Sequence, residues 1–259
     1  MQLSVVIIAR DEARHIGEAL QSARGIAGEL LVLLDDRTRD ETAQIALAHG
    51  ARVVREPWRG FAAQRNRALD VCQGEWVLFL DADERLSAEL AAEIVQIADC
   101  RLPIDRSQSA IVGYWIPRHN LFFGQVVRGG GWYPDRQLRL LRRTQARYDE
   151  TQLVHEVATL DGQAGALDGH LTHINIEQIG EFWRKQRSYA IQEAQTLFLA
   201  GRRARWRNQA GAPAREFLRR FVQLGGWRDG RLGLLLCGTL AFFELIKFVH
   251  LKALEPAFK

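Results

Sequence analysis

Acidic residues follow three apolar segments in the N-terminal half of this chain. Arg10-Asp11-Glu12 comes after the first segment, Asp35-Asp36 after the second, and Asp81-Ala82-Asp83-Glu84 after a later one. Carboxylates that share a site repel one another, so they need a cation, an arginine or the hydrogen-bond donors of a ligand to compensate them. Mg²⁺ or Mn²⁺ on a nucleotide diphosphate provides this compensation, because both ions accept oxygen ligands. These residues therefore predict a site that grips a cation-bridged pyrophosphate.

Asp81 and Asp83 form a D-x-D triplet within the third acidic segment. Carboxylates two residues apart in extended backbone project to the same side. One of them can then bind the metal while the other orients a ribose or a metal-bound water. Such a triplet is usually a solvated turn, but its position directly after the apolar run WVLFL favours the functional interpretation.

The apolar segments indicate which elements position these acids. Residues 4–9, 30–34 and 76–80 are short continuous apolar runs, typical of strands buried on both faces of a mostly parallel sheet. Helical patterns separate them, so we predict an α/β fold with a Rossmann-like, doubly wound sheet. Ligands of such sheets bind beyond the carboxyl ends of the strands. If the strands are parallel, their acidic ends converge on one edge.

The middle of the chain has a different pattern. From residue 111 to about 160, strand-like pieces alternate with glycine and proline, which predicts an antiparallel or mixed β extension. The run Gly129-Gly130-Gly131 is typical of a hinge or of a backbone that approaches a ligand closely. Residues 177–199 return to a helical pattern.

The C-terminal region combines arginines with an apolar segment. Seven arginines lie between residues 202 and 220, and residues 232–251 are apolar apart from a few positions that include Glu244, Lys247 and His250. About 20 apolar residues are needed to span a bilayer, but charges inside the segment disfavour spanning. We therefore favour a helix that lies in the membrane interface, with the arginines facing anionic headgroups. The alternative is a helix pair packed on the domain, with solvated arginines.

Composition excludes several classes of protein. The chain has 259 residues, 47% of them hydrophobic and 25% charged, with a formal charge of +4, which is ordinary for a globular protein. Its three scattered cysteines support neither a disulfide framework nor a zinc site, and no secretory signal is apparent, so we expect a cytoplasmic protein. The chain has no G-x-G-x-x-G after its first strand and no P-loop, which argues against dinucleotide-dependent oxidoreductases and P-loop NTPases.

Four motifs together resemble family 2 glycosyltransferases of the GT-A fold. They are SVVIIARDE (4–12), LLDDRTRDET (33–42), GFAAQRNRALD (60–70) and EWVLFLDADE (75–84). Three later segments are similar to the subgroup that includes lipopolysaccharide-core β-glucosyltransferases: GGWYPDRQLRLLRR (130–143), LVHE (153–156) and the helix around 185–190. The resemblance covers nearly the whole chain and is weaker after residue 201.

This resemblance implies roles for individual residues. Asp35 should accept a hydrogen bond from a uracil ring, Arg65 or Asn66 should reach the nucleotide, and Asp81 and Asp83 match the ribose and metal positions. The predicted nucleotide-sugar-binding residues are Ala9, Asp11, Glu12, Asp35, Arg65, Asn66, Asp81, Ala82, Arg136 and Arg139, and the predicted metal ligands are Asp83 and His173. The second motif commonly reads D-S-G-S-T-D-G-T, whereas Asp36 and Arg37 replace small residues here. This departure affects the expected specificity for base and sugar more than the expected reaction.

Family 2 enzymes invert the anomeric carbon, which requires a base on the acceptor side. Glu156 is the predicted catalytic base, with Asp135 and Glu150 as rivals; a structural carboxylate paired with an arginine is the alternative for Glu156. Arg136 and Arg139 are expected to stabilise the leaving diphosphate together with the metal, or else to be ordinary cross-strand charges.

Histidines and tryptophans add further candidates. His173 lies where GT-A enzymes often place a late histidine that completes the metal shell, although a histidine pair such as His170 and His173 is more often structural. The tryptophans able to stack on sugar rings are Trp115, Trp132 and Trp183, although aromatic residues in strands more often belong to the core.

The leading hypothesis is an inverting enzyme dependent on Mg²⁺ or Mn²⁺. It moves a hexose, with glucose favoured, from a UDP-sugar to a glycolipid or cell-envelope saccharide such as lipopolysaccharide core, at the cytoplasmic face of the inner membrane. Residues 1–110 are expected to form the nucleotide-sugar half, 111–200 the acceptor and catalytic half, and 201–259 a basic, amphipathic helical region. The alternatives are a polyprenyl-phosphate sugar synthase and, outside enzymes, a basic nucleic-acid-binding or membrane scaffold protein.

Overall fold

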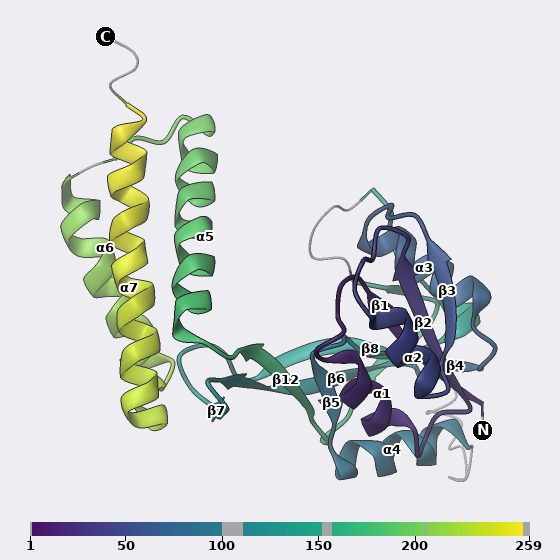
Figure 1. Ribbon diagram of the computed structural model, residues 1–259. Coiled ribbons are helices and arrows are strands. Elements are labelled where there is room, and N and C mark those ends of the chain that lie inside the picture. Colours follow the sequence, from purple (N-terminus) through teal and green to yellow (C-terminus); the bar gives the residue numbers. More distant parts are fainter. Residues whose placement is uncertain (1, 100–110, 152–156, 205, 256–259) are drawn as a thin grey trace. The chain divides into compact units, whose positions relative to one another are not determined.

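The computed structural model describes residues 2–99, 111–151, 157–204 and 206–255 (Figure 1). The chain divides into two compact units. The α/β unit consists of Met1–Arg118 and Asp135–His173, and the helical unit of His119–Pro134 and Ile174–Lys259. The functional division expected at residues 110 and 200 stays a prediction, but the compact units divide elsewhere. The helix over 179–199, expected in the acceptor half, belongs to the helical unit.

The sheet starts with four parallel strands in the order β3-β2-β1-β4. Their bounds are β1 (Leu3–Ala9), β2 (Glu29–Asp35), β3 (Arg52–Glu56) and β4 (Trp76–Phe79). The order continues through β8 (Asp135–Arg142), β6 (Ile111–Phe122), β12 (Leu171–Ile176) and β5 (Glu84–Leu86). Strands β7 (Gln125–Val127) and β11 (Gln163–Ala166) also pair with β6. The predicted α/β fold with a β-rich extension is confirmed, because β8 runs antiparallel to both β4 and β6.

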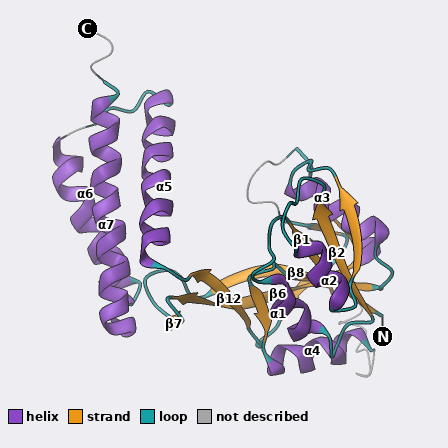
Figure 2. Cartoon of the chain, in the orientation of Figure 1, coloured by secondary structure: helices purple, strands orange, loops and turns teal. Residues whose placement is uncertain are grey.

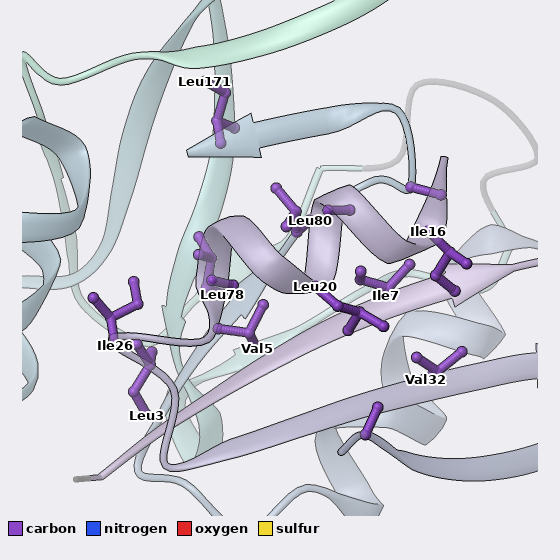
Figure 3. Packing of buried hydrophobic residues seen from close by; sticks show 14 of the residues in the cluster. Leu3, Val5, Ile7, Ile16, Leu20, Ile26, Val32, Leu78, Leu80 and Leu171 are labelled. Carbon is purple, nitrogen blue, oxygen red and sulfur yellow. The ribbon is translucent and has the colours of Figure 1, made fainter. Parts of the chain in front are cut away.

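Helices cover both faces of the parallel strands, as the continuous apolar runs predict. On one face lie α1 (Ile16–Ala23), α2 (Thr42–Ala48) and α4 (Ala88–Ala98), and on the other lies α3 (Phe61–Val71). Alternate residues of each strand serve the two cores: Val5 and Ile7 pack with Leu20 of α1, and Val6 packs with Leu69 of α3. Figure 3 shows the first of these cores, which contains Val5, Ile7, Leu20 and Leu78. The buried strands thus form a rigid base for the loops at their carboxyl ends.

The remainder of the α/β unit includes a few short elements. It contains a 3₁₀ turn (Arg143–Gln145) and the two-stranded pair of β9 (Ala146–Arg147) and β10 (Thr159–Leu160).

Three long elements dominate the helical unit (Figure 2). They are α5 (Ile179–Leu199), α6 (Trp206–Leu218), which continues into a π-helical turn (Arg219–Gln223), and α7 (Gly230–Ala253), preceded by a 3₁₀ turn (Gly226–Asp229). The core of this unit contains Phe122, Phe182 and Leu236.

The glycine run packs against the chain itself. A Cβ at Gly129 would lie 2.1 Å from the carbonyl oxygen of Gly225, so the close approach predicted for this run is made to backbone. Asp229 fixes the same place, because its carboxylate accepts the backbone N–H groups of Arg128 and Gly129, each at 2.8 Å. The glycines thus join the 119–134 segment to the α6–α7 turn.

Candidate functional site

The acidic segments meet at the carboxyl ends of the parallel strands, as predicted. Strand β1 lies between β2 and β4, so Asp35, which ends β2, and Asp11 and Asp81, which come two residues after β1 and β4, lie at three neighbouring strand ends. Arg10 links two of these ends, because its Nε lies 3.6 Å from an Asp11 oxygen and 4.0 Å from an Asp35 oxygen. Asp11 has a φ of 53°, in the left-handed region, and accepts the backbone N–H of Arg39 at 2.8 Å. The first strand end is thereby turned toward the second.

Glu12 lies among several other carboxylates at this edge. Burial, reinforced by repulsion from Asp83, Asp40, Asp81 and Asp11, raises the pKa of Glu12 to about 7. A carboxyl group beside four other carboxylates is compensated when a cation binds. The charge pattern therefore fits a cation-binding edge.

Arg139 holds the D-x-D turn from the neighbouring strand β8. The pairing of β8 with β6 skips Arg139, because Leu138 and Leu140 face consecutive residues of β6. Arg139 is thus the extra residue of a β-bulge, a device that re-aims side chains next to active sites. Its buried guanidinium binds both carboxylate oxygens of Asp81 and lies 3.2 Å from Glu84.

Glu84 is a central residue that the sequence analysis did not include among the site residues. It is fully buried, accepts the Asp81 backbone N–H at 2.9 Å, and contacts both Arg118 (3.0 Å) and Arg139. Arg118 in turn donates to Asp135 at 2.9 and 2.7 Å. The available sequence signal was an acid directly after the D-x-D triplet; nothing local singled out Arg118.

Asp81 stays ionised within this network. Burial favours the protonated form, but Arg139 and Arg65 together hold the pKa of Asp81 well below its usual range. One terminal nitrogen of Arg65 lies 4.0 Å from an Asp81 oxygen, and its guanidinium lies over the rings of Phe79 and Tyr148 at 5.2 and 5.5 Å. Arg65 therefore sits beside Asp81, at the predicted site.

Asp83 and His173, the predicted metal ligands, lie together. Strand β12 pairs with β5 so that His173 faces Glu84, and His173 Nε2 is 3.3 Å from Asp83 Oδ2. A carboxylate oxygen and an imidazole nitrogen are donors that a divalent ion such as Mn²⁺ accepts. Within the described residues, no group of three or more His, Cys, Asp or Glu side chains is arranged for a metal ion. The pair therefore fits an ion whose other ligands come from a bound diphosphate and water.

Asp35 is occupied by its own neighbour. The backbone N–H and Nε of Arg37 both donate to Asp35 Oδ1 at 2.9 Å, and its Nη2 donates to Oδ2 at 2.6 Å. These hydrogen bonds lower the pKa of Asp35 far below its usual range. The substitution of a small motif residue by Arg37 thus engages the carboxylate expected to bind the base.

Asn66 lies near the site but binds protein backbone. Its amide donates to the Tyr148 carbonyl at 2.9 Å and to Glu150 Oε1 at 2.8 Å, and its oxygen accepts the Tyr148 N–H at 2.9 Å. In this arrangement Asn66 fixes residues 148–150 to α3. The nucleotide contact predicted for Arg65 or Asn66 stays a prediction, and no local pattern in the sequence indicates that Asn66 binds the Tyr148 backbone.

The other predicted site residues are placed as follows. Ala9 and Ala82 are buried at the ends of β1 and β4, and Arg136 is exposed on β8, three residues before the bulge. Glu156, the predicted base, lies outside the described residues. Of its rivals, Asp135 is bound by Arg118 and Glu150 by Asn66.

Comparisons of the sequence with known proteins find glycosyltransferases. The model of glycosyl transferase family 2 matches residues 4–160. The lipopolysaccharide core biosynthesis glycosyltransferase LpsC of Rhizobium meliloti (strain 1021) is 30% identical over 255 residues, which cover 95% of this chain and 90% of LpsC. The uncharacterized glycosyltransferase RT0209 of Rickettsia typhi is 27% identical over 78% of this chain and 70% of its own.

Solved structures give weaker likenesses. S. aureus TarS 1-349 in complex with UDP has a TM-score of 0.48 and 14% identity over 100% of this chain and 91% of that chain. Glucosyl-3-phosphoglycerate synthase from Mycobacterium tuberculosis, in complex with Mn²⁺, UDP and phosphoglyceric acid, has a TM-score of 0.44 and 18% identity over 70% and 72%.

Proposed function

Because the chain belongs to glycosyl transferase family 2, we propose that it moves a hexose, with glucose favoured, from a UDP-sugar to a lipopolysaccharide-core or related envelope saccharide. The observation that carries this proposal is the convergence of Asp11, Asp35 and Asp81 at neighbouring strand ends. The acceptor class rests on the similarity to LpsC over nearly the full length of both chains. The proposed reaction is a single displacement that inverts the anomeric carbon.

The donor side of the proposed mechanism uses the acidic edge. Asp83 and His173 would hold a divalent cation, which when bound neutralises charge on the leaving diphosphate. Asp81, kept ionised and fixed by Arg139, is positioned to accept hydrogen bonds from a ribose. Arg65 and the exposed Arg136 are the cations proposed to face the diphosphate, while Arg139, buried and bound to two carboxylates, acts as a positioning residue.

On the acceptor side, Glu156 remains the proposed base. A base must come within hydrogen-bond reach of the attacking hydroxyl. Its rivals already bind other groups, since Asp135 pairs with Arg118 and Glu150 accepts from Asn66. Because protein groups already hold both rivals, we propose Glu156 ahead of them.

We further infer that the helical unit rests on an anionic membrane surface at the cytoplasmic face. By length and composition, the segment Gly226–Ala253 is apolar enough to cross a membrane, and 33% of its apolar 18-residue window is buried inside the protein. Lys247 within it pairs with Glu244 and with Glu193 of α5, which ties α7 to its neighbour. Exposed Leu224 and Trp227 at the α6–α7 turn support contact with lipid rather than spanning.

Replacing Asp83 by Asn tests the proposed donor site. We expect transfer to fall at least about a hundredfold and the Mn²⁺-dependent rise in melting temperature with UDP to disappear, because the variant loses a metal ligand. Asp161→Asn, at an exposed aspartate away from the site, is the matched control and should keep both properties. Circular dichroism checks that each variant is folded. Full activity of Asp83→Asn would refute the metal assignment.

A further inference from the structure

A cavity of about 410 Å³ lies within the helical unit. It is lined by α5, α6, α7 and the ends of β6 and β12. Volumes of about 300–1,000 Å³ are typical of small-molecule sites. None of the functions proposed above uses this cavity.

Aromatic rings form one part of the lining. Phe122 packs edge-on against both Trp132 and Phe182, with ring centroids 5.4 and 5.9 Å apart. Tyr189 contributes a ring that is 47% exposed. Phe122 and Phe182 are buried, so Tyr189 is the ring that offers a flat surface to the C–H face of a ligand.

Ion pairs form the other part of the lining. Lys247 Nζ lies 2.6 Å from Glu244 and 3.2 Å from Glu193. Arg220 pairs with Glu216, donates to the Gly130 carbonyl at 2.8 Å and lies over the Trp132 ring. Together with Lys185, the lining holds three cations and three carboxylates. It therefore carries no excess positive charge.

The equal numbers of cations and carboxylates in the lining favour a neutral ligand over an anionic one. A phosphate requires cations that are free to neutralise it, whereas Arg220 and Lys247 are already neutralised by carboxylates. Hydroxyl groups donate and accept at the same time, so a polyhydroxylated ring can bond to carboxylates, cations and the amide of Gln186 together. Aromatic faces next to such groups match a sugar, which has apolar faces and a polar rim.

We propose that this cavity binds a neutral sugar ring of the acceptor, against Tyr189 and between the two groups of ion pairs. The identity of the ring as part of an acceptor rests on the proposed glycosyl transfer. The binding itself rests only on the cavity.

The test uses the full chain and a deacylated core oligosaccharide from rough lipopolysaccharide, observed by saturation-transfer-difference NMR. We expect signals on the C–H protons of the sugar. The double variant Gln186→Ala/Tyr189→Ala should weaken binding at least about tenfold, because it removes an amide and a ring from the lining. Gln195→Ala, an exposed glutamine of the same helix outside the lining, should bind like the wild type. Both lining residues are partly or largely exposed, so the double variant should fold, and its melting temperature checks this.

Three results would overturn the inference: unchanged affinity in the folded double variant, no binding by the wild type, or displacement of the oligosaccharide by inorganic phosphate with a steep loss of affinity in salt. Measurement of UDP binding distinguishes failure of the cavity inference from failure of the proposed function. If the wild type binds UDP and transfers sugar while the double variant keeps its acceptor KM, the cavity inference fails alone. If UDP binding fails while the oligosaccharide still binds in the cavity, the proposed function fails alone.

Discussion

Arg37 shows at the scale of one residue how a motif departure changes a site. Its side chain donates to both oxygens of Asp35, the residue predicted to accept a hydrogen bond from the base. Arg37→Ser restores a small residue and removes the guanidinium hydrogen bonds to that carboxylate, so we expect UDP to bind about five- to tenfold more tightly in a calorimetric titration. Arg39→Ser, at an exposed arginine two residues on, serves as the control. Weaker UDP binding by Arg37→Ser would instead mean that Arg37 contacts the nucleotide.

Glu12 provides a prediction about pH at the same scale. Its pKa is raised to about 7 by burial and by neighbouring carboxylates, from an ordinary value of 4.5. Between these pH values the folded state keeps a proton that the unfolded state releases, so the contribution to stability is full below pH 4.5 and is lost as the pH rises through 7. Glu12→Gln should therefore raise the free energy of unfolding by roughly 1 to 2 kcal/mol at pH 8, after allowance for solvent screening. At pH 4, urea unfolding should show no difference; a difference of equal size there would contradict this cause.

Strand β8 illustrates how an element, rather than a motif, positions the site. Its bulge at Arg139 delivers a buried guanidinium to Asp81 and Glu84. Arg139→Met leaves both carboxylates without that partner, so we expect a loss of about 3 to 5 kcal/mol in urea unfolding. Arg136→Met, exposed on the same strand, should change the free energy of unfolding by no more than about 0.5 kcal/mol. Equal effects of the two substitutions would show that the bulge does not anchor the turn.

The elements of the α/β unit were largely predictable from sequence. Continuous apolar runs predicted β1, β2 and β4 because strands buried on both faces leave no polar alternation. The bulge was not predictable, since it arises from a register between β6 and β8 that no local pattern encodes. The structure brings the predicted metal ligands Asp83 and His173 together, and their role stays a prediction. The contact of Asn66 with the Tyr148 backbone joins residues far apart in sequence, so no local pattern encodes it either.

At the scale of the whole molecule, association with a membrane is the property to measure. Exposed Leu224 and Trp227 lie on the α6–α7 turn beside Arg228, so vesicles that contain phosphatidylglycerol should retain the protein, and less so at high salt. The double variant Leu224→Ser/Trp227→Ser should bind such vesicles about tenfold more weakly in co-sedimentation. Phe61→Ser, at an exposed ring of the α/β unit, is the control. Equal retention on neutral phosphatidylcholine vesicles would argue against a role for the arginines.

The chain passes from the α/β unit to the helical unit and back, which limits where it can be truncated. The helical unit receives residues His119–Pro134 before the chain returns to complete the sheet with Asp135–His173. A stop codon after residue 173 would therefore not release an intact α/β unit, because Phe122 would lose its contact with the ring of Phe182 and become an exposed apolar surface. A minimal soluble fragment would need an internal excision of 119–134, replaced by a short turn that joins β6 to β8, as well as removal of the C-terminal helices.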